Sequence, residues 1–88
     1  MMTKFYIYML MNASGMFYVG LTTHLQQILW KHRQKKMLSF NANHAFSTLV
    51  LAEELTDIHL ALARFDELKN ATYYQKQLLM QSANAANS

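Results

Sequence analysis

The sequence contains no cysteine and no proline, and it is poor in acidic residues. Without thiols the chain forms neither disulfides nor thiolate metal sites, so its stability must come from packing. This composition is compatible with a reducing compartment, and we expect a cytoplasmic protein. Five Asp and Glu residues stand against eight Lys and Arg residues, and the resulting net charge of +3 mildly favours a polyanionic partner.

Long apolar runs are also missing. The most apolar segment, residues 5–11, is followed by Asn12 and Gly15, so it is far shorter than the roughly 20 residues of a membrane span. It also lacks a small-residue cleavage site, so we predict no signal peptide and no membrane partner.

The 88 residues allow one domain with one modest core. We expect residues 1–82 to form this domain. Residues 83–88 are small and polar, and we expect them to form a flexible tail.

Three segments carry the aromatic and branched residues that are typical of strands. Residues 5–11 and 16–21 flank a turn-forming group at 12–15, which predicts a β-hairpin. Residues 47–53 predict a third strand, after a loop at 39–46.

Helices are predicted between and after these strands. Apolar residues spaced three and four apart predict a helix over 25–36, with Thr22 or Thr23 as its N-cap. A second helix follows Thr56 and Asp57, and its apolar face comprises Ile58, Ala61, Leu62, Phe65 and Leu68. A third helix is predicted from Thr72 to about Gln81. The order of hairpin, helix, strand, helix and helix indicates an α+β fold.

Two tripeptides give this architecture a family resemblance. Residues 6–8 read Tyr-Ile-Tyr and residues 18–20 read Tyr-Val-Gly, and this pair resembles the paired motifs of the GIY-YIG nuclease superfamily, except that Tyr6 stands where the family has Gly. Further matches to the small bacterial single-domain branch continue along nearly the whole chain, at Thr22, Leu25, Leu29, Trp30, His32, Leu49, Val50, Ala63, Arg64, Leu68, Lys69, Lys76, Leu79 and Asn84. The resemblance implies a three-stranded antiparallel sheet flanked by about three helices.

The resemblance also implies metal-assisted phosphodiester hydrolysis, for which two positions are missing. The family tyrosines are present as Tyr8 and Tyr18, and the helix histidine as His32. The family's phosphate-binding arginine aligns with Ile28, and its metal-binding glutamate aligns with Phe65. The loop at 40–44 also lacks the lysine and tyrosine that the family carries there. Both replaced positions fall on apolar helix faces, so we expect a site filled with hydrocarbon, which disfavours phosphate and hydrated cations.

We therefore predict no metal site and no cofactor. Asp66 and Glu67 are poor substitutes for a carboxylate at position 65, because one helical step rotates a side chain by about 100°. The three catalytic residues Tyr8, Tyr18 and His32 would then be a remnant. On strands, the tyrosines would equally serve core packing.

A basic cluster near the end of the first helix suggests another role. Four cationic residues meet there: Lys31, Arg33, Lys35 and Lys36. They are suited to a nucleic-acid backbone, and equally to a solvated helix end.

The leading hypothesis is thus a pseudonuclease that binds a protein partner, a second copy of itself as a homodimer, or nucleic acid. The alternative is an active endonuclease on single-stranded or structured DNA. That enzyme would use Tyr18 and His32 with Mg²⁺ or Mn²⁺ held by carboxylates such as Glu53 or Glu54.

Overall fold

The computed structural model describes residues 3–38 and 45–86, with side chains for residues 3–35 and 45–83. Three strands and three helices follow in the order β1 (Phe5–Met11), β2 (Phe17–Thr22), α1 (Leu25–Leu38), β3 (Thr48–Leu55), α2 (Ile58–Lys69) and α3 (Tyr73–Ala86). The α+β fold predicted from the sequence is confirmed. Most of the predicted loop at 39–46, including the segment 40–44, lies outside the described residues.

The hairpin turn is held by Asn12. Its backbone N–H donates to the Met16 carbonyl at 3.1 Å, and its side-chain Oδ1 accepts from the Met16 N–H at 2.9 Å. Gly15 has φ of 81°, a left-handed conformation that costs glycine little. Asn12 is 4% exposed, so its satisfied side chain is part of the fold.

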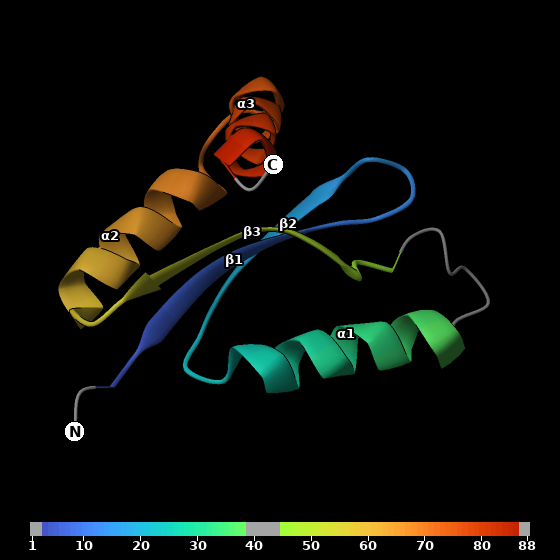
Figure 1. Ribbon diagram of the computed structural model, residues 1–88, viewed down its shortest axis with the longest axis horizontal. Helices are drawn as coiled ribbons and strands as arrows, with labels where there is room; N and C mark the ends of the chain where they lie inside the picture. Colours follow the sequence, from blue (N-terminus) through green and yellow to red (C-terminus); the bar gives the residue numbers. More distant parts are fainter. Residues whose placement is uncertain (1–2, 39–44, 87–88) are drawn as a thin grey trace.

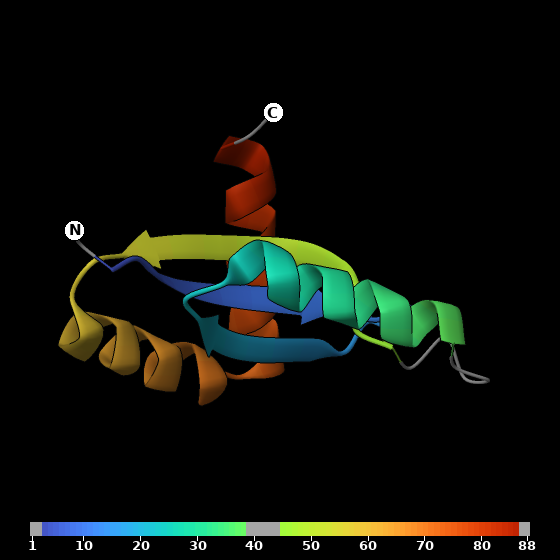
Figure 2. The same cartoon turned by 90° about the horizontal axis from the view of Figure 1, so that it is seen from below.

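The sheet has the order β2-β1-β3, and both pairs are antiparallel (Figures 1 and 2). Tyr8 lies between Gly20 on β2 and Ala52 on β3. A bulge interrupts the β1–β3 register, because Met9 pairs with Leu51 while Leu10 pairs with Leu49. Side chains alternate between faces along a strand, so Ile7 and Tyr8 point to opposite sides of the sheet.

Each face of the sheet has its own apolar cluster. Ile7 packs with Ala61 and Leu68 of α2, whereas Tyr8 packs with Leu10 of β1 and Leu29 of α1. Figure 1 accordingly shows α1 on one side of the sheet, with α2 and α3 on the other. We call these the α2 face and the α1 face.

The boundaries of the helices and strands differ from the prediction mainly at their C-terminal ends. Asp57 caps α2 as expected, accepting from the N–H groups of His59 and Leu60 at 2.8 and 3.2 Å. The strand β3 extends to Leu55, two residues beyond its expected end.

The third helix extends furthest beyond its expected end. It continues to Ala86, so residues 83–86, which were expected to belong to a flexible tail, are helical. The alanines in this segment favour this extension, because alanine has the highest helix propensity of any residue.

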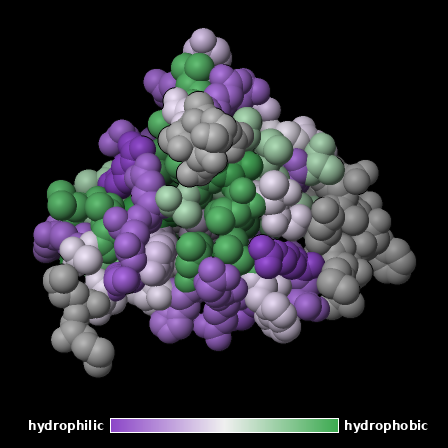
Figure 3. All heavy atoms as spheres, in the orientation of Figure 1, coloured by the Kyte–Doolittle hydropathy of each residue, from purple (hydrophilic) through white to green (hydrophobic). Residues whose placement is uncertain are grey.

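The surface in Figure 3 shows apolar side chains over α2 and near the middle of the view. No helix among residues 3–38 and 45–86 is long and apolar enough to cross a membrane.

A candidate site around Tyr18 and His32

Three of the predicted site residues meet on the α1 face. The ring centroids of Tyr18 and His32 are 5.4 Å apart. The ring centroid of Tyr8 lies 6.2 Å from that of Tyr18 and 6.4 Å from that of His32. Phe46, just before β3, extends the group at 5.7 Å from Tyr18. The strand register brings the tyrosines together, because Tyr18 pairs with Leu10, two residues from Tyr8 on the same face.

Gly20 makes room for this cluster. The Tyr8 ring lies over it, and a Cβ at position 20 would overlap Tyr8 Cζ and Oη and stand 2.6 Å from Cε1. Tyr8 is only 4% exposed, so its ring has little space to move away. The glycine of the second tripeptide is therefore explained by close packing with the tyrosine of the first.

Burial determines the protonation of the inner residues. It raises the pKa of Tyr8 to about 12, assisted by the charge of the Tyr18 phenolate and by a hydrogen bond with Tyr18. Burial also lowers the pKa of His32, as does the nearby positive charge of Lys35, against the opposing effect of a hydrogen bond to the Phe46 backbone. At neutral pH the site thus holds a protonated phenol and a neutral imidazole.

Ile28 lies at the edge of this cluster. It is half-buried and packs against the group formed by Tyr8, Leu10 and Leu29. No cation therefore stands where the family resemblance places an arginine.

The basic residues of α1 lie on two flanks. Lys31 and Lys35 follow Ile28 by three and seven residues, so they share its side of the helix. Arg33 is rotated by about 200° from both lysines, which places it on another side. Lys36 lies on α1, but its side chain is outside the described part. Lys35 thus adjoins the Tyr18 site, since its charge acts on His32, and Lys31 lies one turn before it on the same side of α1.

Phe65 does not share a cluster with Ile28. It packs on the α2 face with Ile7, Ala61 and Leu68, and Lys69 Nζ lies 5.6 Å from its ring centroid. The expectation that Ile28 and Phe65 together fill one site is therefore wrong. Helical periodicity correctly placed each residue on an apolar face, but it does not tell which face of the sheet a helix covers.

The two candidate carboxylates are also engaged elsewhere. Glu53 binds Arg64 through both oxygens, with distances of 2.7 Å to Nε and 2.8 Å to Nη2, on the α2 face. Glu54 accepts from Tyr6 Oη at 3.1 Å and pairs with Lys4 at 3.3 Å. In the described part of the chain, no three His, Asp or Glu side chains form a group that fits a metal ion. The residues present therefore do not fit the divalent ion that the resemblance implies.

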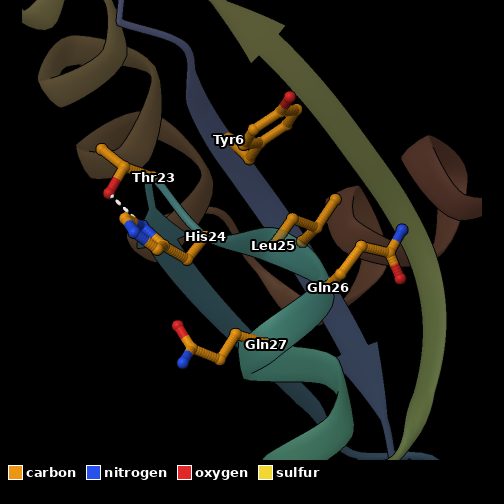
Figure 4. Close-up of a pocket in the computed structure, with 6 residues that line it drawn as sticks. All are labelled: Tyr6, Thr23, His24, Leu25, Gln26 and Gln27. Carbon is orange, nitrogen blue, oxygen red and sulfur yellow. Dashed lines mark hydrogen bonds between the residues drawn. The ribbon is translucent and has the colours of Figure 1, made fainter.

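Sequence reasoning missed a hollow at the start of α1. Its volume is about 410 Å³, and Figure 4 shows the residues that line it: Tyr6, Thr23, His24, Leu25, Gln26 and Gln27. His24 Nδ1 lies 2.7 Å from Thr23 Oγ1, and Thr22 Oγ1 accepts from the His24 N–H at 3.0 Å. These local bonds order the entry into α1. The prediction of Thr22 or Thr23 as the N-cap is wrong, because His24 directly precedes the helix and its carbonyl accepts the first helical bond, from the Ile28 N–H at 3.1 Å.

No family model and no curated protein matches this sequence. Among solved structures, the chain is similar to a UPF0213 protein from Bacillus halodurans, determined in solution by NMR, with a TM-score of 0.59 and 23% sequence identity. The match covers 89% of this chain and 83% of that chain. At this identity the likeness shows the fold alone, so this chain has the α+β fold of that UPF0213 protein.

Proposed function

We propose that this chain is a GIY-YIG-like module that binds nucleic acid without cutting it, through Tyr18, Lys31 and Lys35. The observation that carries the proposal is the side of α1 that bears Ile28 in place of the missing arginine. The exposed Lys31 and Lys35 lie on that side, about one and two turns further along the helix, and the exposed Tyr18 of β2 lies against His32 of the same helix. We call these three binding residues the Tyr18 surface.

The absence of cleavage is supported by the chemistry of the inner residues. Phosphodiester hydrolysis needs fixed positive charge close to the developing phosphate charge. Ile28 supplies none, and Tyr8, with a pKa of about 12, stays protonated at neutral pH. The bidentate contact of Glu53 with Arg64 also holds that carboxylate on the other face.

Binding is supported by the residues that remain at the surface. Tyr18 is 42% exposed although its ring centroid lies 5.4 Å from that of His32, so part of its side chain is available for a base to stack on. Base stacking on an aromatic side chain is worth about 1–3 kcal/mol and tolerates different sequences. Lys31 and Lys35 are exposed on the same flank and are suited to successive phosphates. Unstacked bases are needed, so we propose single strands as the preferred ligand.

The test is fluorescence anisotropy with labelled single-stranded and duplex oligonucleotides across a salt series. Two lysine–phosphate contacts on a single strand predict a slope of about −1.4 in log K against log salt, or about sevenfold weaker binding between 50 and 200 mM salt. Lys31→Glu with Lys35→Glu should abolish this slope, and Tyr18→Ala should weaken binding about tenfold at constant slope.

Arg33→Glu is the matched control, because it changes the same charge on the same helix but on another side. It should change affinity far less than the lysine pair. Equal losses of affinity from Arg33→Glu and from the lysine pair would refute the role of the Tyr18 surface in binding. So would an affinity that changes neither with salt concentration nor with Tyr18→Ala.

One observation favours the alternative of an active endonuclease. His32 is neutral at pH 7 and its ring contacts Tyr18, which is the protonation state that a general base requires. Incubation with single-stranded, duplex and branched DNA in Mg²⁺ or Mn²⁺ distinguishes the two proposals. Cleavage that Tyr18→Phe abolishes would establish the enzyme, and binding without cleavage on every substrate would support the non-cutting module.

A further inference from the structure

The outer edge of β2 is an uncharged strand edge. Its sequence, Phe-Tyr-Val-Gly-Leu-Thr, has neither a charge nor a proline, and β2 is the end strand of the sheet. In an antiparallel ladder, hydrogen-bonded residue pairs alternate with pairs that are not hydrogen-bonded. The backbone hydrogen bond from Asn12 to Met16 makes these two residues a hydrogen-bonded pair, so the next pair along the hairpin, Met11 with Phe17, is not one. It follows that the N–H and C=O groups of Phe17, Val19 and Leu21 point outward, away from β1.

Nothing in the described part of the chain pairs with this outer side of β2. The other edge of the sheet is different, because β3 carries a bulge and two glutamates, Glu53 and Glu54. Charges and bulges are the devices by which strand edges avoid pairing. The edge of β2 has neither device.

An apolar stripe on α2 runs beside this open edge. Ile58 and Leu62 are 39% and 46% exposed, and Phe65 is half-buried next to them. Arg64 reaches across to Glu53 on β3, so that side of α2 faces β3. The stripe residues are rotated about the α2 axis by about 100–160° from Arg64. The stripe therefore lies on the side of α2 that is turned away from β3, toward the open edge of β2. Figure 2 shows α2 lying on the β2 side of the sheet.

We propose that β2 pairs antiparallel with β2 of a second copy of this chain, across a two-fold axis perpendicular to the sheet. Centred on Val19, this register places Phe17 opposite Leu21 of the other copy. Each of the three outward-facing residues then makes two backbone hydrogen bonds with its partner. The two sheets become one continuous antiparallel sheet.

A second copy fits both exposed features at once. A two-fold axis perpendicular to the sheet keeps equivalent faces on the same side, so α2 of one copy lies beside α2 of the other. The two stripes of Ile58, Leu62 and Phe65 are thereby brought toward each other. The strand carries no charge, so self-pairing opposes no like charges within the ladder. A short strand and one helix flank form a small interface, so the dimer should be weak and concentration-dependent.

Sedimentation velocity from about 1 μM to about 1 mM protein tests the association, with amide hydrogen exchange as the structural readout. In concentrated samples the amides of Phe17, Val19 and Leu21 should become protected, while those of Tyr18 and Gly20 are protected by β1 at every concentration. A monomer up to 1 mM would overturn the proposal and leave the edge for a strand of a different protein. A dimer in which the alternating protection is missing would overturn it equally.

Charge exchange on the α2 stripe tests the two-fold geometry. Leu62→Lys and Leu62→Glu should each raise the dimer dissociation constant at least tenfold, because like charges then meet across the axis. An equimolar mixture of the two variants should restore association. Leu60→Lys is the matched control, because Leu60 is 60% exposed on a different side of α2, and its dimer should be unaffected.

Unchanged dimerisation of Leu62→Lys, or a mixture that does not associate, would overturn the proposed arrangement. None of these positions belongs to the Tyr18 surface. Failure of self-pairing therefore does not bear on nucleic-acid binding, which the anisotropy experiment tests separately.

Discussion

Replacing Gly20 with alanine should destabilise the fold through the Tyr8 ring. The new Cβ would overlap Tyr8 Cζ and Oη, and the ring is enclosed by Tyr18, His32 and Leu29. Overpacking of this kind typically costs about 1–3 kcal/mol. The loss of backbone freedom in the unfolded chain offsets about 0.4–1 kcal/mol of that cost. We expect a net loss of about 1.3 kcal/mol, which lowers Tm by about 5–10 °C in a domain of this size.

The assay is urea denaturation followed by circular dichroism, carried out as a double-mutant cycle with Tyr8→Leu. Tyr8→Leu destabilises on its own because it removes a buried ring, but it also opens the space that the new methyl group needs. In that background Gly20→Ala should cost less than about 0.5 kcal/mol, a coupling of at least about 0.8 kcal/mol.

Gly15→Ala serves as the control for this cycle. Its cost comes from the positive φ of 81° at the turn, so it should be the same with either residue at position 8. If Gly20→Ala costs the same in both backgrounds, the overlap with Tyr8 is not the reason for the glycine and the reasoning fails.

Two further predictions concern charged and titratable groups. The His32 imidazole should titrate below 6.5 by NMR, and Lys35→Gln should move the midpoint upward only in part, because burial is the larger cause; an unchanged midpoint would contradict the role of Lys35. Because the folded pKa is lowered, the contribution of His32 to stability is complete above pH 6.5 and is lost as pH falls through the folded pKa. Arg64→Ala should cost about 1–2 kcal/mol in urea denaturation, since it breaks the partly buried contact with Glu53. Glu67→Ala removes only the exposed partner of Arg64 and should cost less than about 0.5 kcal/mol; equal costs would show that the Glu53 contact is not the stabilising one.

Local sequence signals predicted the elements of this fold well. The turn residues at 12–15 and the aromatic runs beside them predicted the hairpin, and Asp57 caps α2 as expected. These signals act over a few residues, so they can be recognised without knowledge of the tertiary structure. The predicted end of α3 was too early, because the polar residues near it are typical of a frayed terminus, whereas the neighbouring alanines continue the helix to Ala86.

The candidate site was predicted in part. Tyr8, Tyr18 and His32, which the sequence analysis grouped as a catalytic remnant, lie close together, and their role stays a prediction. The separation of Ile28 from Phe65 was not predicted, because it depends on which face of the sheet each helix covers. The division of the basic cluster between two flanks of α1 follows from helical geometry once the inward side of α1 is known.

The separation of the two clusters by the sheet also bears on how such a chain changes over evolutionary time. Substitutions in groups that share no partners act nearly additively on stability. Ile28 packs with one cluster and Phe65 with the other, so an apolar residue at either position finds its packing partners whether or not the other position has changed. In terms of packing, the two positions are therefore able to vary independently, and a substitution at one does not require a prior substitution at the other.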